Sequence, residues 1–80
     1  MSAHKPSRTP EALFGQEISV LRRKLGISQE ELAFRADVHR TYVSQIERGI
    51  KSPTLAVILR LSKALECSAG KLISAVESRS

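Results

Sequence analysis

One cysteine, no long apolar run and no strand pattern mark this sequence of 80 residues, and each absence excludes a class of protein. Cys67 is the only cysteine, so no disulfide can form within the chain. Cys67, His4 and His39 are the only cysteine and histidines, and their spacing does not match the paired ligands of a zinc site. We therefore expect no metal. A chain with this cysteine content fits a reducing cytoplasm.

Apolar residues never run far enough to cross a membrane. The longest apolar stretch, residues 55–65, is interrupted by Arg60 and Lys63 and is shorter than the roughly 20 residues that a span needs. Residues 1–10 contain no apolar run, so we expect no signal peptide. Because no segment alternates apolar and polar residues, the sequence predicts helices only.

Basic residues outnumber acidic ones, with 13 Lys and Arg against 8 Asp and Glu and a formal net charge of +5. This balance favours an acidic partner, nucleic acid before an anionic membrane surface, although many small proteins are basic without such a partner. A chain of this length forms one small domain. It buries too little surface to enclose the deep active site of a multi-substrate enzyme.

Apolar spacing and capping residues predict an all-α bundle of five short helices. Thr9, Ser28, Thr54 and Ser68 are suited to begin helices, and Ser28 with Glu31 forms a capping box. The predicted helices cover residues 10–25, 29–36, 40–48, 55–66 and 69–77.

The same pattern divides the chain into a flexible basic tail (residues 1–9), one folded domain (residues 10–77) and a frayed end (residues 78–80). The tail either has no role or reaches into a DNA groove. Gly15 weakens the first turn of its helix, so the regular helix is expected to begin later. Gly26 and Gly49 suit the left-handed position that closes a helix.

Residues 28–49 contain the most informative pattern, two short helices joined by a three-residue turn. Val38 can plug the turn, while Val43 and Ile46 can pack the second helix on the first, as in a helix-turn-helix. The outer face of the second helix carries side chains of the kinds that bind base edges or phosphates. They are Arg40, Thr41, Ser44, Gln45 and Arg48.

Four segments of the chain carry a family resemblance: ISQEELA at 27–33, DVHRTYVSQIERG at 37–49, SPTL at 52–55 and LSKAL at 61–65. They closely resemble the Xre/Cro/C1-type helix-turn-helix family of lambda-like phage repressors, over about residues 12–76. The chain looks most like small stand-alone members such as restriction–modification controller proteins. The resemblance implies a compact lambda-repressor-like domain that binds double-stranded DNA in a prokaryotic cytoplasm and regulates transcription without a cofactor.

The resemblance also implies a role for each matching residue. Gln29 would grip a backbone phosphate, and Tyr42 would lie at the edge of the interface. Arg22 and Glu47 would form a partly buried structural ion pair. The residues matching DNA-contacting positions are Gln29, Arg40, Thr41, Tyr42, Ser44, Gln45, Arg48 and Lys51.

Two residues leave alternatives open. His39 either caps the third helix, contacts a phosphate or is an exposed spectator. Cys67 is expected to be a small buried apolar residue, with a redox-sensitive thiol as the alternative.

Four helices already close a repressor-like core, so the fifth helix is available for an interface. We therefore predict a homodimer. Leu72, Ile73 and Val76 would then form an apolar interface. A two-fold dimer places two third helices about 34 Å apart, so the operator should be a near-palindrome. Alternatively, this helix only covers the core of its own protomer.

Several functions remain open at this point. A regulator would either block RNA polymerase or contact it. The alternative is an antitoxin-like or adaptor protein whose main partner is another protein. The sequence lacks paired carboxylates, a Ser/His/Asp set and a phosphate-cradling loop, so we do not expect an enzyme.

Overall fold

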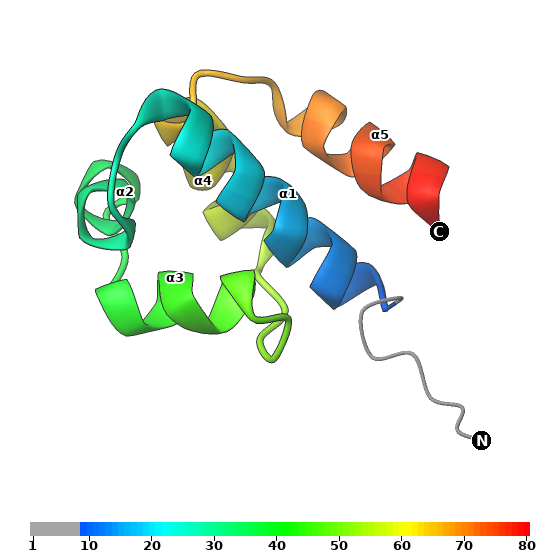
Figure 1. Cartoon of the computed structure of the whole chain (residues 1–80), viewed down its shortest axis with the longest axis horizontal. Coiled ribbons are helices and arrows are strands. Elements are labelled where there is room, and N and C mark those ends of the chain that lie inside the picture. Colours follow the sequence, from blue (N-terminus) through cyan, green and yellow to red (C-terminus); the bar gives the residue numbers. More distant parts are fainter. Residues whose placement is uncertain (1–8) are drawn as a thin grey trace.

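Five helices make up the computed structural model, which describes residues 9–80 (Figure 1). A polar side chain caps the start of each helix. The helices are α1 (Pro10–Leu25), α2 (Gln29–Ala36), α3 (Arg40–Glu47), α4 (Leu55–Ala64) and α5 (Ala69–Arg79). The predicted all-α fold of five helices is confirmed. Except for Thr9, the predicted tail lies outside the described residues, and no described helix is long and apolar enough to span a membrane.

The predicted caps form as the sequence suggests. The hydroxyl of Ser28 accepts a hydrogen bond from the Glu31 N–H at 3.0 Å, and that of Thr54 accepts from the Val57 N–H at 3.2 Å. The reciprocal half of the capping box does not form. The Glu31 carboxylate instead accepts from Arg35 Nε at 2.9 Å, since an arginine one turn along the helix lies within its reach.

Three helix ends differ from the prediction. Helix α3 stops one residue earlier, with Arg48 as its last cap. Helix α4 ends at Ala64 because Glu66 adopts the left-handed conformation, with φ of 61°. Helix α5 continues to Arg79, where frayed residues were expected, because the Arg79 guanidinium donates to Glu17 of α1 at 3.0 Å.

The core corrects one predicted interface residue. Leu72 is only 1% exposed and fills the core of its own protomer, so the expectation that it lies between subunits is wrong. Helix α5 packs on α1 and α4, and this packing covers Leu72. Two leucines at helix ends also lie outside the core, since Leu25 is 37% exposed and Leu55 is 73% exposed.

Gly15 brings α1 and α3 into close contact. A Cβ atom there would lie 2.2 Å from the Ile46 carbonyl oxygen and 2.8 Å from the Glu47 carbonyl oxygen. The expectation that the helix begins after Gly15 is wrong, because α1 is regular from Pro10. This glycine is therefore a packing requirement of the α1–α3 crossing.

We expect Gly15→Ala to lower the free energy of unfolding by about 1–3 kcal/mol, because the new methyl group must push two backbone carbonyls apart. The measurement is the midpoint of urea unfolding. Gly70→Ala in α5 is the matched control, since the nearest atom to its Cβ is 4.0 Å away. A Gly15→Ala protein as stable as Gly70→Ala would contradict the close crossing.

Candidate nucleic-acid interface

Helix α3 has one buried side and one open side. Val43 and Ile46 are fully buried against the core. The opposite side, the α3 outer face, consists of Arg40, Thr41, Ser44, Gln45 and Arg48. Both arginines and the threonine are exposed, while the serine and the glutamine are half-buried. Within residues 9–80 none of these five side chains hydrogen bonds to the protein, so their donors and acceptors are available to a ligand.

The turn before α3 is fixed by backbone geometry and by a cap. Asp37 takes the left-handed conformation with φ of 57°, and the Val38 N–H donates to the Ala33 carbonyl at 3.0 Å. His39 then begins α3, and its Nδ1 accepts a hydrogen bond from the Thr41 N–H at 3.1 Å. Of the alternatives for His39, its role as a cap is confirmed.

A buried ion pair holds the other end of α3. Arg22 of α1 donates from Nε to Glu47 Oε2 at 2.6 Å and from Nη2 to Oε1 at 3.1 Å. The two side chains are 13% and 6% exposed, which confirms the predicted structural pair. Arg22 also donates from Nη1 to the Ile27 carbonyl at 2.9 Å, so it ties the α1–α2 turn to the same point.

Gln29 joins this pair, which the sequence pattern did not indicate. Its Nε2 donates to Glu47 Oε1 at 3.0 Å, so part of the amide serves the protein interior. The second N–H of that amide makes no hydrogen bond within residues 9–80. A glutamine at the start of a helix is ordinarily solvent-exposed, and only the three-dimensional position of Glu47 reveals the bond.

The remaining predicted residues differ in exposure. The Tyr42 ring is half-buried and packs against the core, so only part of it can face a ligand. Lys51 is exposed in the loop after α3. Cys67 is half-buried beside the core, and burial raises the pKa of its thiol, which keeps it protonated and weakly nucleophilic.

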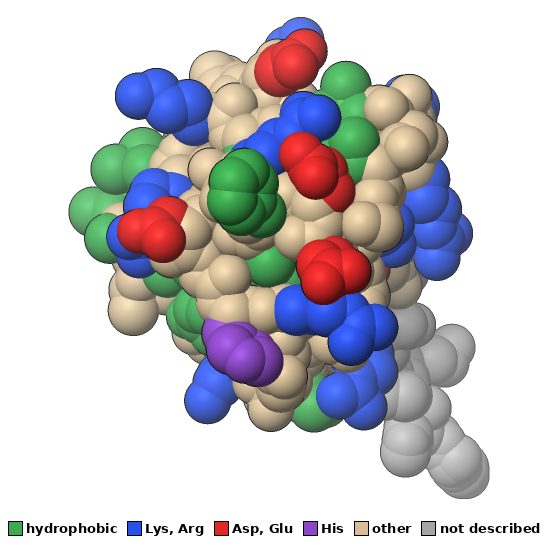
Figure 2. Space-filling model, turned by 90° about the vertical axis from the view of Figure 1, so that its left-hand side faces the viewer, with side chains coloured by type: hydrophobic (Ala, Val, Ile, Leu, Met, Phe, Trp, Pro, Cys, Tyr) green, Lys and Arg blue, Asp and Glu red, His purple; other side chains and the backbone are tan. Residues whose placement is uncertain are grey.

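Acidic and basic side chains of residues 27–53 differ in whether they are paired. Residues 27–53 contain four basic and four acidic side chains, yet Glu47 is sequestered by Arg22 and Glu31 is paired with Arg35. Figure 2 shows the side of the molecule on which α2 lies; Lys, Arg and His side chains line its lower edge, at the level of α3 in Figure 1. Among residues 9–80, no three His, Cys, Asp or Glu side chains gather to hold a metal ion. The α3 outer face therefore offers positive charge and neutral hydrogen-bonding groups.

Comparison with known proteins agrees with this geometry. Residues 18–72 match the helix-turn-helix family. The control protein C.BamHI of Bacillus amyloliquefaciens is 52% identical over 54 residues, which cover 66% of this chain and 67% of that protein. The crystal structure of the restriction–modification controller protein C.AhdI of Aeromonas hydrophila has a TM-score of 0.76 at 40% identity, covering 78% of this chain and 94% of that one.

This chain is also similar to a repressor whose structure has been solved in complex with DNA. The P22 c2 repressor, crystallised with a synthetic operator, has a TM-score of 0.72 at 40% identity. The match covers 75% of this chain and 91% of that chain. The resemblance inferred from the motifs is thereby confirmed.

We expect Glu47→Gln to lower the free energy of unfolding by about 3 kcal/mol, because it leaves the Arg22 charge buried without its partner. Glu31→Gln is the control: its pair with Arg35 has side chains 45% and 38% exposed, so its loss should cost at most about 0.5 kcal/mol. Urea unfolding of both variants measures the difference. Equal small losses would show that the Arg22–Glu47 pair does not hold α3.

Proposed function

This chain belongs to the helix-turn-helix family, and from that premise we propose that it is a transcriptional regulator that binds a near-palindromic operator as a homodimer. The family binds DNA and is not enzymatic. The observation that carries the proposal is the α3 outer face, whose side chains are all unengaged within the described protein while three arginines elsewhere are paired. Such a face is complementary to a major groove.

Each group on this face suits a part of the duplex. Arg40 can bind the two acceptors of a guanine, and Gln45 can bind an adenine. Thr41 and Ser44 can hydrogen bond to either kind of base edge. Phosphates are the proposed contacts of Arg48 and Lys51 and of the remaining N–H of Gln29, with Tyr42 at the edge of the interface. The phosphate contacts supply salt-sensitive affinity, and the base contacts supply sequence preference.

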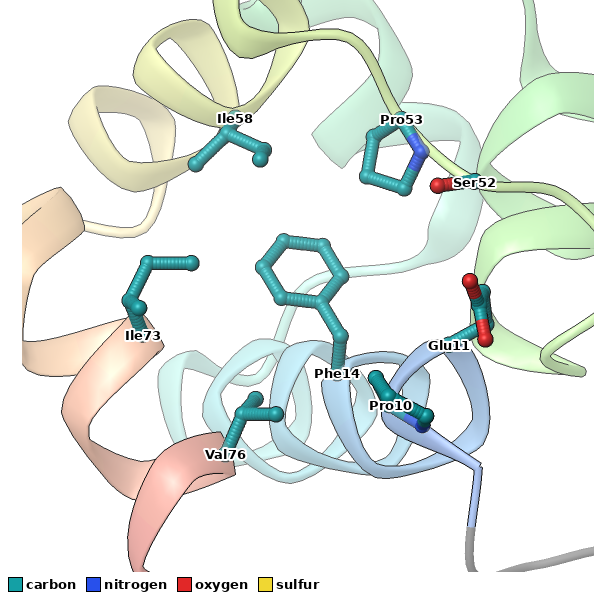
Figure 3. A pocket seen from close by; sticks show the side chains of 8 residues that line it. All are labelled: Pro10, Glu11, Phe14, Ser52, Pro53, Ile58, Ile73 and Val76. Carbon is teal, nitrogen blue, oxygen red and sulfur yellow. The ribbon is translucent and has the colours of Figure 1, made fainter. Parts of the chain in front are cut away.

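The proposed dimer surface lies around α5. A mainly apolar groove of about 150 Å³ lies beside α5. Figure 3 shows Phe14 at its centre, Ile73 and Val76 on the α5 side, and Ile58 and Pro53 across it. Ile73 is 45% exposed, although it is apolar. On α4, Leu55 and Leu59 are exposed on either side of Ile58 in the sequence. An apolar groove and exposed apolar side chains on a small domain favour association with a second copy.

Binding-site selection from a random duplex pool, at two salt concentrations, tests the function. A near-palindrome with half-sites about one helical turn apart is expected. The similarity to restriction–modification controller proteins favours a promoter as the site, where a bound dimer would block or contact RNA polymerase. Weak, salt-sensitive binding without sequence enrichment would overturn the proposal and favour the antitoxin-like or adaptor function, which a pull-down would then examine.

We expect Arg40→Ala to weaken operator binding by about 1–3 kcal/mol and to relax the preference at one base pair of each half-site. Titration of the selected duplex and a repeated selection measure the two effects. Arg60→Ala, which removes the same charge from α4, is the matched control and should keep the sequence preference. Unchanged preference in Arg40→Ala would exclude a base contact.

We expect Ile73→Asp to shift the protein from dimer to monomer while the helices remain folded, since a charge in an apolar interface is poorly solvated. Sedimentation equilibrium and circular dichroism measure the two properties. Ser74→Asp, which adds the same charge at an exposed neighbouring position, should leave the dimer intact. Leu72→Asp is unsuitable here, because it would unfold the protomer. A dimeric Ile73→Asp protein would remove α5 from the interface.

A further inference from the structure

His39 has a second nitrogen whose state follows from the cap. A neutral imidazole carries its proton on one of its two nitrogens. Because Nδ1 accepts the Thr41 N–H at 3.1 Å, the proton of the neutral ring lies on Nε2. The cap therefore makes Nε2 a hydrogen-bond donor.

The cap also fixes where this donor points. Nδ1 is turned toward the first turn of α3, so Nε2 lies at the far edge of the ring, away from the helix backbone. His39 is exposed, and within residues 9–80 its ring makes no other hydrogen bond. It immediately precedes Arg40 and Thr41, the first two residues of the α3 outer face. A donor held in this way loses little further side-chain entropy on binding.

We propose that His39 is a further DNA-contact residue, in which Nε2–H donates to a phosphate oxygen of the duplex backbone; this rests on the proposed function. The cap holds the ring at the end of α3, beside the groove-facing residues and not among them, which places it at the backbone of the duplex. The positive end of the α3 dipole also favours an anion here. A ring whose Nδ1 accepts the cap hydrogen bond carries a single N–H and no charge, so the contact would add affinity without releasing a counterion.

The decisive variant is His39→Ser, because serine already caps α2 and α5 in this chain. His39→Ser keeps a side-chain acceptor for the N–H groups of the first turn of α3, as Ser28 and Ser68 do for α2 and α5, and removes the distal ring donor. We expect its urea midpoint to match that of the wild type, while the Kd for the selected operator rises about ten-fold for each half-site. His39→Ala, which removes cap and donor together, should be both less stable and weaker in binding.

The salt dependence separates this contact from those of the cationic residues. We expect His39→Ser to keep the wild-type slope of log K against log salt concentration. Lys51→Ala should lower that slope by about one for each half-site. A slope that falls equally in both variants would overturn the neutral contact.

Single methylphosphonate substitutions in the selected duplex locate the phosphate. At one position in each half-site the wild type should lose affinity and His39→Ser should lose none. Equal losses in the two proteins at every position, unchanged affinity of His39→Ser, or an altered base preference in that variant would each overturn the phosphate contact alone. A wild type that binds no duplex specifically would overturn the proposed function, and this inference with it.

Discussion

The orientation of α3 depends on the ion pair between Arg22 and Glu47. Arg22 contacts α3 through Glu47 and the α1–α2 turn through the Ile27 carbonyl, and Gln29 of α2 donates to the same carboxylate. Burying two charges costs desolvation free energy comparable with their attraction, so such a pair contributes little net stability. Its effect is on orientation, because α1 and α2 both donate hydrogen bonds to the one carboxylate that α3 carries. Near this ion pair, the close crossing at Gly15 brings the backbones of α1 and α3 together.

The same pair decides the charge that α3 presents. Glu47 belongs to the same helix as Arg40, and an exposed carboxylate there would repel phosphate. With Arg22 neutralising it, the outer face keeps its positive charges, although residues 27–53 carry equal numbers of acidic and basic residues. A charge count along the sequence therefore underestimates the basic character of this surface. The three-dimensional pairing determines it.

The helices could be predicted from local sequence signals, whereas contacts between residues distant in the sequence could not. Capping acts over only three residues, so a single side chain indicates where a helix begins. The residues that do so here are Thr9, Ser28, Thr54 and Ser68. The burial of Leu72 depends on α1 and α4, which are distant in sequence, so its apolar character alone could not separate a core residue from an interface residue. The motif resemblance anticipated the Arg22–Glu47 pair but not its bond to Gln29. His39 stayed ambiguous because histidine is an uncommon cap, and only the Nδ1 geometry resolves it.

The two sides of α5 connect oligomerisation to recognition. Leu72 is buried against the core beneath α5, and in the proposed dimer the neighbouring Ile73 meets the second copy. Helix α5 packs on α1, and Arg79 is paired with Glu17 there; α1 in turn carries Arg22. Helix α1 therefore links α5, the element of the proposed dimer surface, to the Glu47 carboxylate on α3. In the proposed dimer this packing would also set the distance between the two α3 helices, because close-packed groups yield little. Such a regulator would then select operators by half-site spacing as well as by base sequence.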